Sequence, residues 1–538
     1  MKFRIPKKTD FLWGVSFALP AVVFFRYAMR WSANIPWKDD YPIVLEFLNG
    51  FLGNGSLQHK LWLVVEQTNE HRIILIKLLA LVQYVLLHEV NFKGLVFMGN
   101  LGYILFVYLL VFLAKKADFT NLQILPLPYI LFSLTQYQNI VWAAAQVYYW
   151  SALFALFFLI ALTRKNIFVV IGLYALNLGI IAGGLILYPI GLLFLLLEKR
   201  YRDLLVFFCA SSILTGLYFF RYSSPEIYPS TASIFMHLDR LAEFFFVFLG
   251  NAALSSKLAI PLGILVVMLL GLIFYSAKEK QKLLYLCVLW ILFTSAVVAI
   301  SRNSLGIESA INSRYATYGL ITWACTFLGV IYFLRVRGKE QAMLFVTRIM
   351  ILASIFYFSL SIVRLEVSAL LPREFDGKVS YMVTTLNQPD APNYSLLIEA
   401  KKLGIFDYQK SLDLRHPVTS IPAEPAINSN ISGVIDAMAG GHLSGWAVIP
   451  GLKTQDARIS ILLKDGTSII KIPTYMVERP DISTVFKIPF MYDYSGYEAY
   501  LNAYAISARS DQLLGIMVEN GKNTAISWQT VPAIQIGK

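Results

Sequence analysis

The chain has 538 residues, of which 57% are hydrophobic and only 15% are charged, and its formal net charge is +13. Soluble globular domains carry about 25% charged residues, so this composition excludes an ordinary soluble protein and indicates a polytopic α-helical membrane protein. The positive charge does not indicate a nucleic-acid partner, because many basic residues flank apolar segments, as the positive-inside bias requires. The three cysteines all lie within apolar runs and give neither a disulfide framework nor a thiolate metal site.

The first apolar segment, Phe11–Met29, follows a basic start. No small-residue cleavage site of the Ala-x-Ala type follows it, so we expect a retained anchor and not a cleaved signal peptide. The positive-inside bias places its basic end in the cytoplasm. The next segment, Trp31–Arg72, is therefore expected on the outer side of the membrane.

This outer segment carries two adjacent carboxylates near its start, Asp39 and Asp40. A carboxylate can act as a general base and take the proton of an acceptor hydroxyl, and a second one can raise its pKa through like-charge proximity. The pair could instead be a solvated loop, or it could cap the segment that starts at Tyr41. The sequence does not choose between the two carboxylates.

The same segment ends with Glu70, His71 and Arg72, directly before an apolar helix. An arginine can hold a phosphate through two parallel donors, and Glu70 is suited to bind a sugar hydroxyl or to hold the base. Alternatively, Asn69 and Glu70 cap the next helix while Arg72 extends its head to the interface. The six histidines show no ligand spacing, so the sequence predicts no metal site and indicates no divalent metal as a cofactor.

The apolar segments that follow are assigned by length and by the basic turns between them. Ile73–Leu87 is shorter than the ~20 residues of a span, and we expect it to lie along the outer interface, so that Leu95–Leu113 returns to the cytoplasm at Lys115. With these choices the chain has about 11 spans and everything after Arg364 is outside. The remaining expected spans are Asn121–Thr135, Val147–Leu162, Ile167–Ala182, Leu185–Leu197, Leu204–Phe220, Leu258–Tyr275, Leu283–Ile300, Tyr318–Leu334 and Ala342–Ile362.

Amides and aromatic side chains gather at the next predicted outer turn. The candidates for sugar contacts there are Gln138, Asn139, Trp142 and Gln146. Such side chains match the hydroxyls and apolar faces of sugars, although an interfacial aromatic belt would have the same composition. Tyr188 lies in another outer turn, Gly183–Pro189, which either faces the same cavity or is only a tight hairpin.

A second charged cluster on the outer side contains Arg302, Glu308, Arg314 and Tyr315. Arginine keeps its charge, so Arg302 and Arg314 are suited to a lipid-linked phosphate at the membrane surface. Glu308 is a further candidate for a sugar contact. Arg314 lies just before a span, where a lone charge is either functional or extended to the interface.

The composition changes after Glu366. Residues 366–430 are expected to form a linker with one short helix over Tyr394–Leu403. Residues 431–538 alternate in short runs separated by turn residues, which predicts a mainly-β sandwich domain. Its expected strands include a hairpin of Ile459–Leu463 and Ser468–Ile472, followed by Tyr500–Ala505 and Leu513–Val518.

Taken together, the motifs of residues 1–365 resemble the GT-C superfamily of polyprenol-dependent glycosyltransferases, in particular its bacterial multi-span members. The matching residues are Asp39-Asp40, Asn69 to Arg72, Gln138-Asn139 with Trp142, Leu187-Tyr188-Pro189 and Ser313-Arg314-Tyr315. The resemblance implies a GT-C-like catalytic domain over residues 1–365, interfacial helices in the first outer loop, and a catalytic carboxylate at Asp39 or Asp40. Gly445-Trp446-Ala447 and Arg479-Pro480-Asp481 resemble a small β-sandwich module of glycan-handling proteins, which would contact an acceptor glycan or partner, or cap the catalytic cavity.

The resemblance implies an inverting glycosyltransferase of a bacterial inner membrane, with a cytoplasmic N-terminus and a periplasmic C-terminal domain. It would move a sugar from undecaprenyl phosphate to a hydroxyl of a surface glycan, such as O-antigen of lipopolysaccharide or its lipid-linked precursor. Arg72, Arg302 or Arg314 would hold the lipid phosphate, while Glu70 and His71 would orient the acceptor or the base. The alternatives are a polysaccharide polymerase or ligase, and a transporter or flippase for lipid-linked glycans. A transporter needs charges along a path through the bilayer, whereas the charges here cluster at one face.

Overall fold

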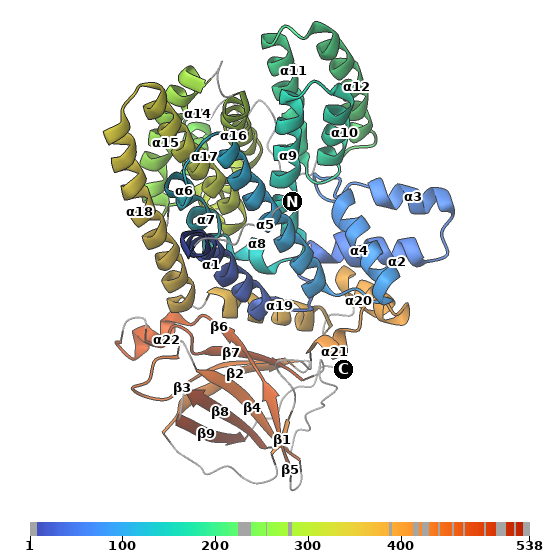
Figure 1. Ribbon diagram of the computed structural model, residues 1–538. Helices are drawn as coiled ribbons and strands as arrows, with labels where there is room; N and C mark the ends of the chain where they lie inside the picture. Colours follow the sequence, from blue (N-terminus) through green and yellow to red (C-terminus); the bar gives the residue numbers. More distant parts are fainter. Residues whose placement is uncertain are drawn as a thin grey trace. The chain divides into compact units, whose positions relative to one another are not determined.

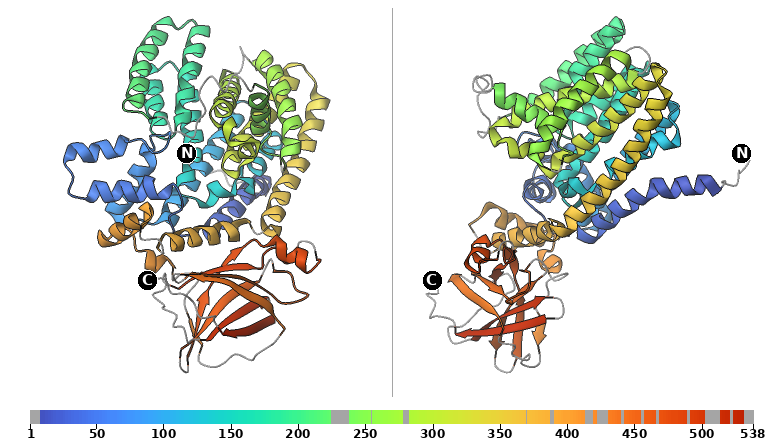
Figure 2. Two further views of the ribbon diagram at one scale, coloured as in Figure 1. Left: turned by 180° about the vertical axis from the view of Figure 1, so that it is seen from behind. Right: turned by 90° about the vertical axis from the view of Figure 1, so that its left-hand side faces the viewer.

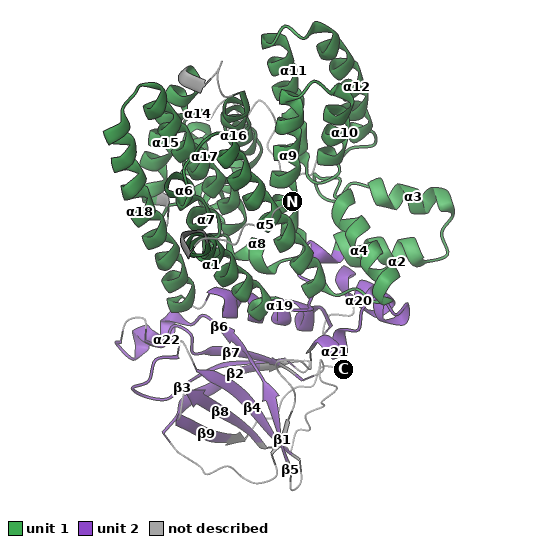
Figure 3. Ribbon diagram, viewed as in Figure 1, with its two compact units in different colours: residues 1–32, 42–368 green, residues 33–41, 369–538 purple. Residues whose placement is uncertain are grey.

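The chain divides into two compact units, one of residues 1–32 and 42–368 and one of residues 33–41 and 369–538 (Figure 3). The segment Ala33–Tyr41, from the predicted first outer loop, thus belongs with the C-terminal region. The computed structural model describes residues 8–223, 238–253, 255–277, 282–368, 370–386, 390–412, 419–421, 430–439, 442–454, 457–465, 468–488, 491–501, 513–520 and 523–530.

The first unit is built from helices (Figure 1). Its α-helices are α1 (Lys8–Trp31), α2 (Phe47–Leu52), α3 (Leu57–Val65), α4 (Ile74–Leu87), α5 (Phe92–Lys116), α6 (Asn121–Ile124), α7 (Pro126–Leu131), α8 (Tyr137–Val141), α9 (Val147–Thr163), α10 (Ile167–Leu178), α11 (Leu187–Leu197), α12 (Tyr201–Phe219), α14 (Leu238–Leu249), α15 (Ser256–Ala277), α16 (Lys282–Arg302), α17 (Ala316–Val336) and α18 (Glu340–Val367). Shorter turns are η1 (Tyr41–Glu46, a π-helix that starts in the second unit), η2 (Leu134–Gln136), η3 (Ala144–Gln146), η4 (Ala182–Ile186), η5 (Asn303–Leu305), η6 (Ile307–Ile311) and η7 (Ser313–Tyr315).

Within the described part of the chain, eight helices are long and apolar enough to cross a membrane. They are Phe11–Trp31, Phe92–Lys116, Ala144–Thr163, Tyr201–Phe219, Lys257–Tyr275, Lys282–Leu305, Ser313–Val336 and Glu340–Val367. Figures 1 and 2 show three of them, α15, α17 and α18, side by side. The prediction of a multi-pass membrane protein is confirmed, whereas the count of about 11 spans stays a prediction.

The expected span over Asn121–Thr135 is not a continuous helix, and its crossing of the membrane stays a prediction. The segment breaks into α6, α7 and η2, and α7 begins at Pro126 and contains Pro128. Proline lacks the N–H that a helix needs and disfavours helix in the residue before it. Broken helices are tolerated at membrane depth where they are buried in protein, and every residue of α7 is buried.

Within the described residues, four further apolar helical segments have only 10–17 residues, namely Tyr41–Leu52, Ile74–Leu87, Ile167–Leu178 and Ala182–Leu197. The helix α4 has 14 residues and α10 has 12, which at about 1.5 Å per residue is well below the ~30 Å hydrocarbon core. The stretch Ala182–Leu197 likewise falls in the shorter class. The length of α4 agrees with a helix that does not cross alone. Its place at the interface, and the crossing of α10 and of residues 182–197, stay predictions.

The second unit begins with three helices after its short N-terminal segment. They are α19 (Leu370–Leu386), α20 (Pro392–Lys402) and α21 (Tyr408–Leu412). The expected short helix over Tyr394–Leu403 corresponds to α20. The sequence did not predict α19, because its polar composition and Pro372 are typical of a linker, although proline is tolerated in the first turn of a helix.

The rest of the second unit is β-rich. Its strands are β1 (Thr419–Ile421), β2 (Ser432–Ala439), β3 (His442–Val448), β4 (Arg458–Asp465), β5 (Ser468–Pro473), β6 (Tyr475–Val477), β7 (Gly496–Tyr500), β8 (Leu513–Asn520) and β9 (Asn523–Thr530), with a short helix α22 (Pro480–Val485). They form a five-stranded sheet, β1-β5-β4-β8-β9, and a four-stranded sheet, β2-β3-β7-β6. All the strand pairs are antiparallel. The sandwich itself stays a prediction.

Both sheets contribute to one hydrophobic core, in which Leu443 and Ala499 come from one sheet and Ile461 and Ile516 from the other. The predicted hairpin is confirmed as the antiparallel pair β4 and β5, where Asp465 faces Ser468. The predicted strand Leu513–Val518 corresponds to β8. The predicted strand Tyr500–Ala505 begins where β7 ends, and residues 502–505 lie outside the described part.

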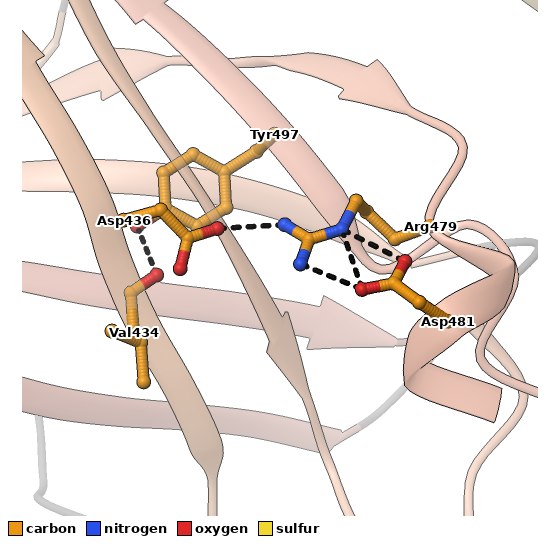
Figure 4. Close-up of polar contacts among 5 residues, drawn as sticks. All are labelled: Val434, Asp436, Arg479, Asp481 and Tyr497. Carbon is orange, nitrogen blue, oxygen red and sulfur yellow. Dashed lines mark hydrogen bonds and ion pairs between the residues drawn. The ribbon is translucent and has the colours of Figure 1, made fainter. Parts of the chain in front are cut away.

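The motif Arg479-Pro480-Asp481 forms a surface ion cluster in this unit (Figure 4). The Arg479 guanidinium donates to Asp436 Oδ2 at 2.6 Å and to Asp481 at 2.8–3.1 Å, and thereby joins β2 to α22. Asp436 lies between Ile435 and Ala437, where the register of β2 shifts, and such bulges re-aim side chains. We call Arg479, Asp436 and Asp481 the surface clasp.

The neighbouring motif Gly445-Trp446-Ala447 lies in β3. A Cβ atom at Gly445 would overlap the carbonyl oxygen of Val434, so the close approach of β2 requires glycine there. The Trp446 ring packs against Phe486, with ring centroids 6.0 Å apart. Both motifs therefore have structural roles inside the second unit.

Candidate functional site

A cavity of about 440 Å³ lies within the first unit. Its walls come from the loop before α4, the start of α9, the segment from η4 into α11, the end of α12, the end of α16, and the start of α17 with η7. We call it the helical cavity. Segments that are far apart in the sequence meet here, so no single motif predicts it.

The charged part of the helical cavity contains Glu70, His71 and Arg302. Arg302, the last residue of α16, forms an ion pair with Glu70. The Ala182 N–H donates to His71 Nδ1 at 3.4 Å, which leaves His71 Nε2 to donate toward Glu70 Oε1 at 3.3 Å. The three side chains are only 16–19% exposed. Charge pairs interact more strongly in such a partly buried place than in bulk water.

A tight backbone turn presents Glu70 to the cavity. Thr68 and His71 exchange two backbone hydrogen bonds, of 2.8 and 3.0 Å. Asn69 has a left-handed φ of 51°, which asparagine tolerates better than most residues. The expected cap of α4 by Asn69 or Glu70 is not observed, because the N-cap position is Ile73 and no side chain caps the helix.

Arg72 and Lys77 hold this loop in place. Arg72 Nε donates to the Tyr218 carbonyl at 2.6 Å, and its two other nitrogens donate to the carbonyls of Val65 and Phe220. Burial lowers the pKa of the Arg72 guanidinium. Lys77 Nζ donates to the carbonyls of Leu63 in α3 and of Glu66 just after it, each at 2.9 Å, and burial lowers the pKa of Lys77 to about 8. The donors of Arg72 are thus engaged by backbone, and its predicted contact with a lipid phosphate stays untested.

The remaining walls of the helical cavity are aromatic and apolar. The Tyr148 ring meets Tyr315 and Tyr318 edge-on, with centroids 5.8 and 6.0 Å away. Further lining comes from Tyr218, Tyr222, Phe219, Phe293, Val297, Val298, Ile300 and Pro189. A cavity that combines a small charged cluster with wide apolar walls matches an amphiphile that carries one polar head.

Four of the predicted site residues line the helical cavity, namely Glu70, His71, Arg302 and Tyr315. Sequence reasoning missed Tyr148, Tyr218 and Tyr222. Tyr148 lies two residues after Gln146 of the predicted outer turn, and Tyr218 and Tyr222 lie at the end of an apolar run. No helical spacing links Tyr218 and Tyr222, because α12 ends at Phe219 and Tyr222 lies beyond it.

Asp39 and Asp40 belong to the second unit, whereas the lining of the helical cavity belongs to the first. Asp40 is 1% exposed and its Oδ2 accepts the Trp37 N–H at 3.0 Å. Burial lowers the pKa of Lys378, and the nearby carboxylate of Asp40 opposes this shift. Asp40 therefore stabilises the backbone of its own loop and lies near the charge of Lys378 in the same unit. Asp39 is only half-buried. Of the two predicted bases, Asp39 is the more accessible.

The predicted amide cluster stabilises the broken helices instead of lining the helical cavity. Asn139 Nδ2 donates to the Arg314 carbonyl at 2.8 Å and to Thr317 Oγ1 at 2.9 Å. Gln146 Nε2 donates to the carbonyls of Asn139 and Trp142. These bonds satisfy backbone groups that a continuous helix would have paired internally.

The other predicted residues also lie outside the lining. The backbone N–H of Gln138 donates to Ser313 Oγ at 3.2 Å. Tyr188 shares a hydrogen bond of 2.6 Å with Ser212, Glu308 is exposed, and the Arg314 guanidinium lies 5.4 Å from the centre of the Tyr315 ring. Their predicted contacts with sugar or phosphate stay predictions.

Among the described residues, no group of three or more His, Cys, Asp or Glu side chains could hold a metal ion. Comparisons of the chain with models of protein families, with curated proteins and with solved structures found no match. A function is therefore inferred from the residues and from the helical cavity.

Proposed function

We propose that this protein is a GT-C-type glycosyltransferase that transfers a hexose from a polyprenyl-phosphate donor. The observation that carries the proposal is the Arg302–Glu70–His71 cluster inside an otherwise aromatic and apolar cavity. Arg302 would hold the lipid phosphate through charge-assisted hydrogen bonds. The apolar walls would receive the first isoprene units of the lipid, and the tyrosines would contact the sugar.

In the proposed reaction the acceptor oxygen forms a bond to the anomeric carbon from the side opposite the phosphate. The bond between that carbon and the phosphate oxygen breaks, and its electron pair leaves with the lipid phosphate, so the anomeric configuration inverts. Arg302 stabilises the charge that develops on the leaving phosphate. The proton of the acceptor hydroxyl passes to a carboxylate acting as general base.

Two sources for that carboxylate follow from the sequence and the structure. The resemblance to GT-C enzymes implies Asp39 or Asp40, and the greater exposure of Asp39 favours it over the buried Asp40. Glu70 is the carboxylate that the helical cavity itself contains. The proposal for the donor site does not depend on which carboxylate takes the proton.

The rest of the proposal follows the resemblance. The donor would be undecaprenyl phosphate carrying a hexose in the outer leaflet of a bacterial inner membrane. The acceptor would be a surface glycan such as O-antigen, or its lipid-linked precursor. The N-terminus would be cytoplasmic and the second unit periplasmic. The basic turns at the cytoplasmic ends of the predicted spans support this orientation.

The test is sugar transfer in membranes supplied with polyprenyl-phosphate hexoses and extracted cell-surface glycan. Arg302→Gln should lower the transfer rate by about 10²–10³-fold, which is the usual effect of losing one stabilising donor for a developing charge. Arg202→Gln, a matched change at an exposed arginine of α12, should leave the rate unchanged. Full transfer by Arg302→Gln would refute the donor site. A wild-type protein that transfers no such sugar would favour a transporter of lipid-linked glycans.

A further inference from the structure

A second cavity, also of about 440 Å³, lies within the second unit between α19 and β6. The lining positions on α19 are 373, 376, 377, 380, 381 and 384. This spacing of three and four residues places them along one side of the helix. The opposite wall includes Tyr475, Glu478 and Tyr494. We call this cavity the α19 groove.

A charged and aromatic pair is fixed inside the α19 groove. The Arg373 guanidinium lies 3.7 Å from the centre of the Tyr494 ring and donates to Glu478 at 3.3 Å. These two contacts hold Arg373 and Tyr494 together on the groove wall before a ligand binds, so little conformational entropy is lost on binding.

The α19 side of the groove also carries an anchored tyrosine and hydroxyl groups. The Tyr381 ring meets Tyr41 edge-on with centroids 5.6 Å apart, and its hydroxyl accepts from Asn393 Nδ2 at 3.0 Å. Ser380 and Thr384 add hydroxyl groups to the same side of α19. Aromatic side chains that are already held in place lose little conformational entropy when a ligand binds.

The charges of the α19 groove select among ligands. Arg373 is opposed by Asp376 and Glu478, so the lining has more negative than positive groups. Such a lining disfavours phosphates and acidic sugars. Rings with an apolar face, many hydroxyl groups and no charge match the tyrosines, the hydroxyls and the paired charges together.

We propose that the α19 groove binds an uncharged oligosaccharide. This site is distinct from the helical cavity, whose proposed ligand is a lipid phosphate. It gives the second unit a function of its own, namely to hold a glycan chain. The inference does not rest on the proposed transfer reaction, because binding requires none of the residues of the helical cavity.

The test uses the full chain in lipid nanodiscs and four soluble neutral hexasaccharides: maltohexaose, cellohexaose, mannohexaose and chitohexaose. Binding is measured by saturation-transfer difference NMR. Gly377 lies in the groove on α19, and a Cβ atom there would meet nothing within 4 Å. Gly377→Phe should therefore fill the groove without disturbing the fold. Gly172→Phe is the matched control, because Gly172 is also an exposed helical glycine whose Cβ would meet nothing within 4 Å.

We expect at least one hexasaccharide to bind wild type and Gly172→Phe equally well. Gly377→Phe should abolish that binding, and Tyr494→Ala should weaken it about tenfold through loss of one aromatic contact. The absence of binding by all four sugars would overturn the proposal. So would unchanged binding by Gly377→Phe. Sugar transfer measured in parallel separates this result from a failure of the proposed transferase.

Discussion

Two arginine clusters of similar chemistry lie in different surroundings in this protein. Arg302 pairs with Glu70 inside the helical cavity, where both side chains are less than a fifth exposed. Arg479 pairs with Asp436 and Asp481 in the surface clasp, where the two acids are 40% and 55% exposed. In the surface clasp, Arg479 joins β2 to α22. In the helical cavity, the charged side chain of Arg302 lies beside open space that a ligand can enter. The surroundings of an arginine, and not its pairing, indicate which one could bind a ligand.

The acid partners provide the most sensitive contrast between the two clusters. Glu70→Gln keeps the shape of the side chain and removes its charge. We expect it to lower sugar transfer by about 10²–10³-fold, because Arg302 loses the charged partner that holds it beside the leaving phosphate. Asp481→Asn makes the same chemical change in the surface clasp and should leave transfer unchanged. Rates are compared at equal amounts of inserted protein. Equal activity of both variants would remove the functional distinction between the clusters.

Arg72 sharpens the comparison, because it lies two residues from Glu70 and yet donates to backbone carbonyls. We expect Arg72→Gln to lower the free energy of unfolding by about 3 kcal/mol, since it leaves buried carbonyls without a charged donor. The melting temperature of the protein in detergent is the measurement. Arg302→Gln, measured in the same way, should lower the melting temperature less than Arg72→Gln, because the Arg302–Glu70 pair borders an open cavity whereas Arg72 donates to three carbonyls. An Arg72→Gln protein that melts normally but fails to transfer sugar would instead assign Arg72 to the donor phosphate.

The smallest expected effect concerns pH and the surface clasp. The hydrogen bonds from Arg479 lower the pKa of Asp481. A carboxyl group with a lowered pKa in the folded state adds stability above its unfolded pKa of about 3.9, and this stability is lost as the pH falls through the folded pKa. Wild type should therefore lose slightly more stability than Asp481→Asn between about pH 5 and pH 3. Identical pH profiles would show that solvent screens this pair completely.

The sequence predicted those elements best that depend only on neighbouring residues, namely hairpin strands and long apolar helices. Alternating residues and turn signals around Asp465 predicted the pair β4 and β5, and apolar length predicted the membrane helices. Over Asn121–Thr135 the apolar composition did not predict that the helix is broken around Pro126 and Pro128. It also missed α19, whose buried residues such as Phe375 and Met382 pack within a polar sequence.

The candidate site was only partly predictable. Glu70, His71 and Arg302 attracted attention as charges beside apolar segments, and the sequence could justify each of them individually. It could not show that Arg302 pairs with Glu70, because the two residues lie 232 positions apart and meet only through helix packing. Likewise, it could not show that the donors of Arg72 are taken by the carbonyls of Val65, Tyr218 and Phe220.

By itself, the sequence determined that this is a multi-pass membrane protein with a β-rich C-terminal region, because hydrophobic length and strand alternation are local properties of the chain. Only the tertiary structure decided which charged side chains line the same cavity and which donate to backbone carbonyls instead. It also decided that residues 33–41 belong to the C-terminal unit. Those outcomes depend on contacts between distant segments, and the energy of a charge depends on its surroundings more than on its neighbours in sequence.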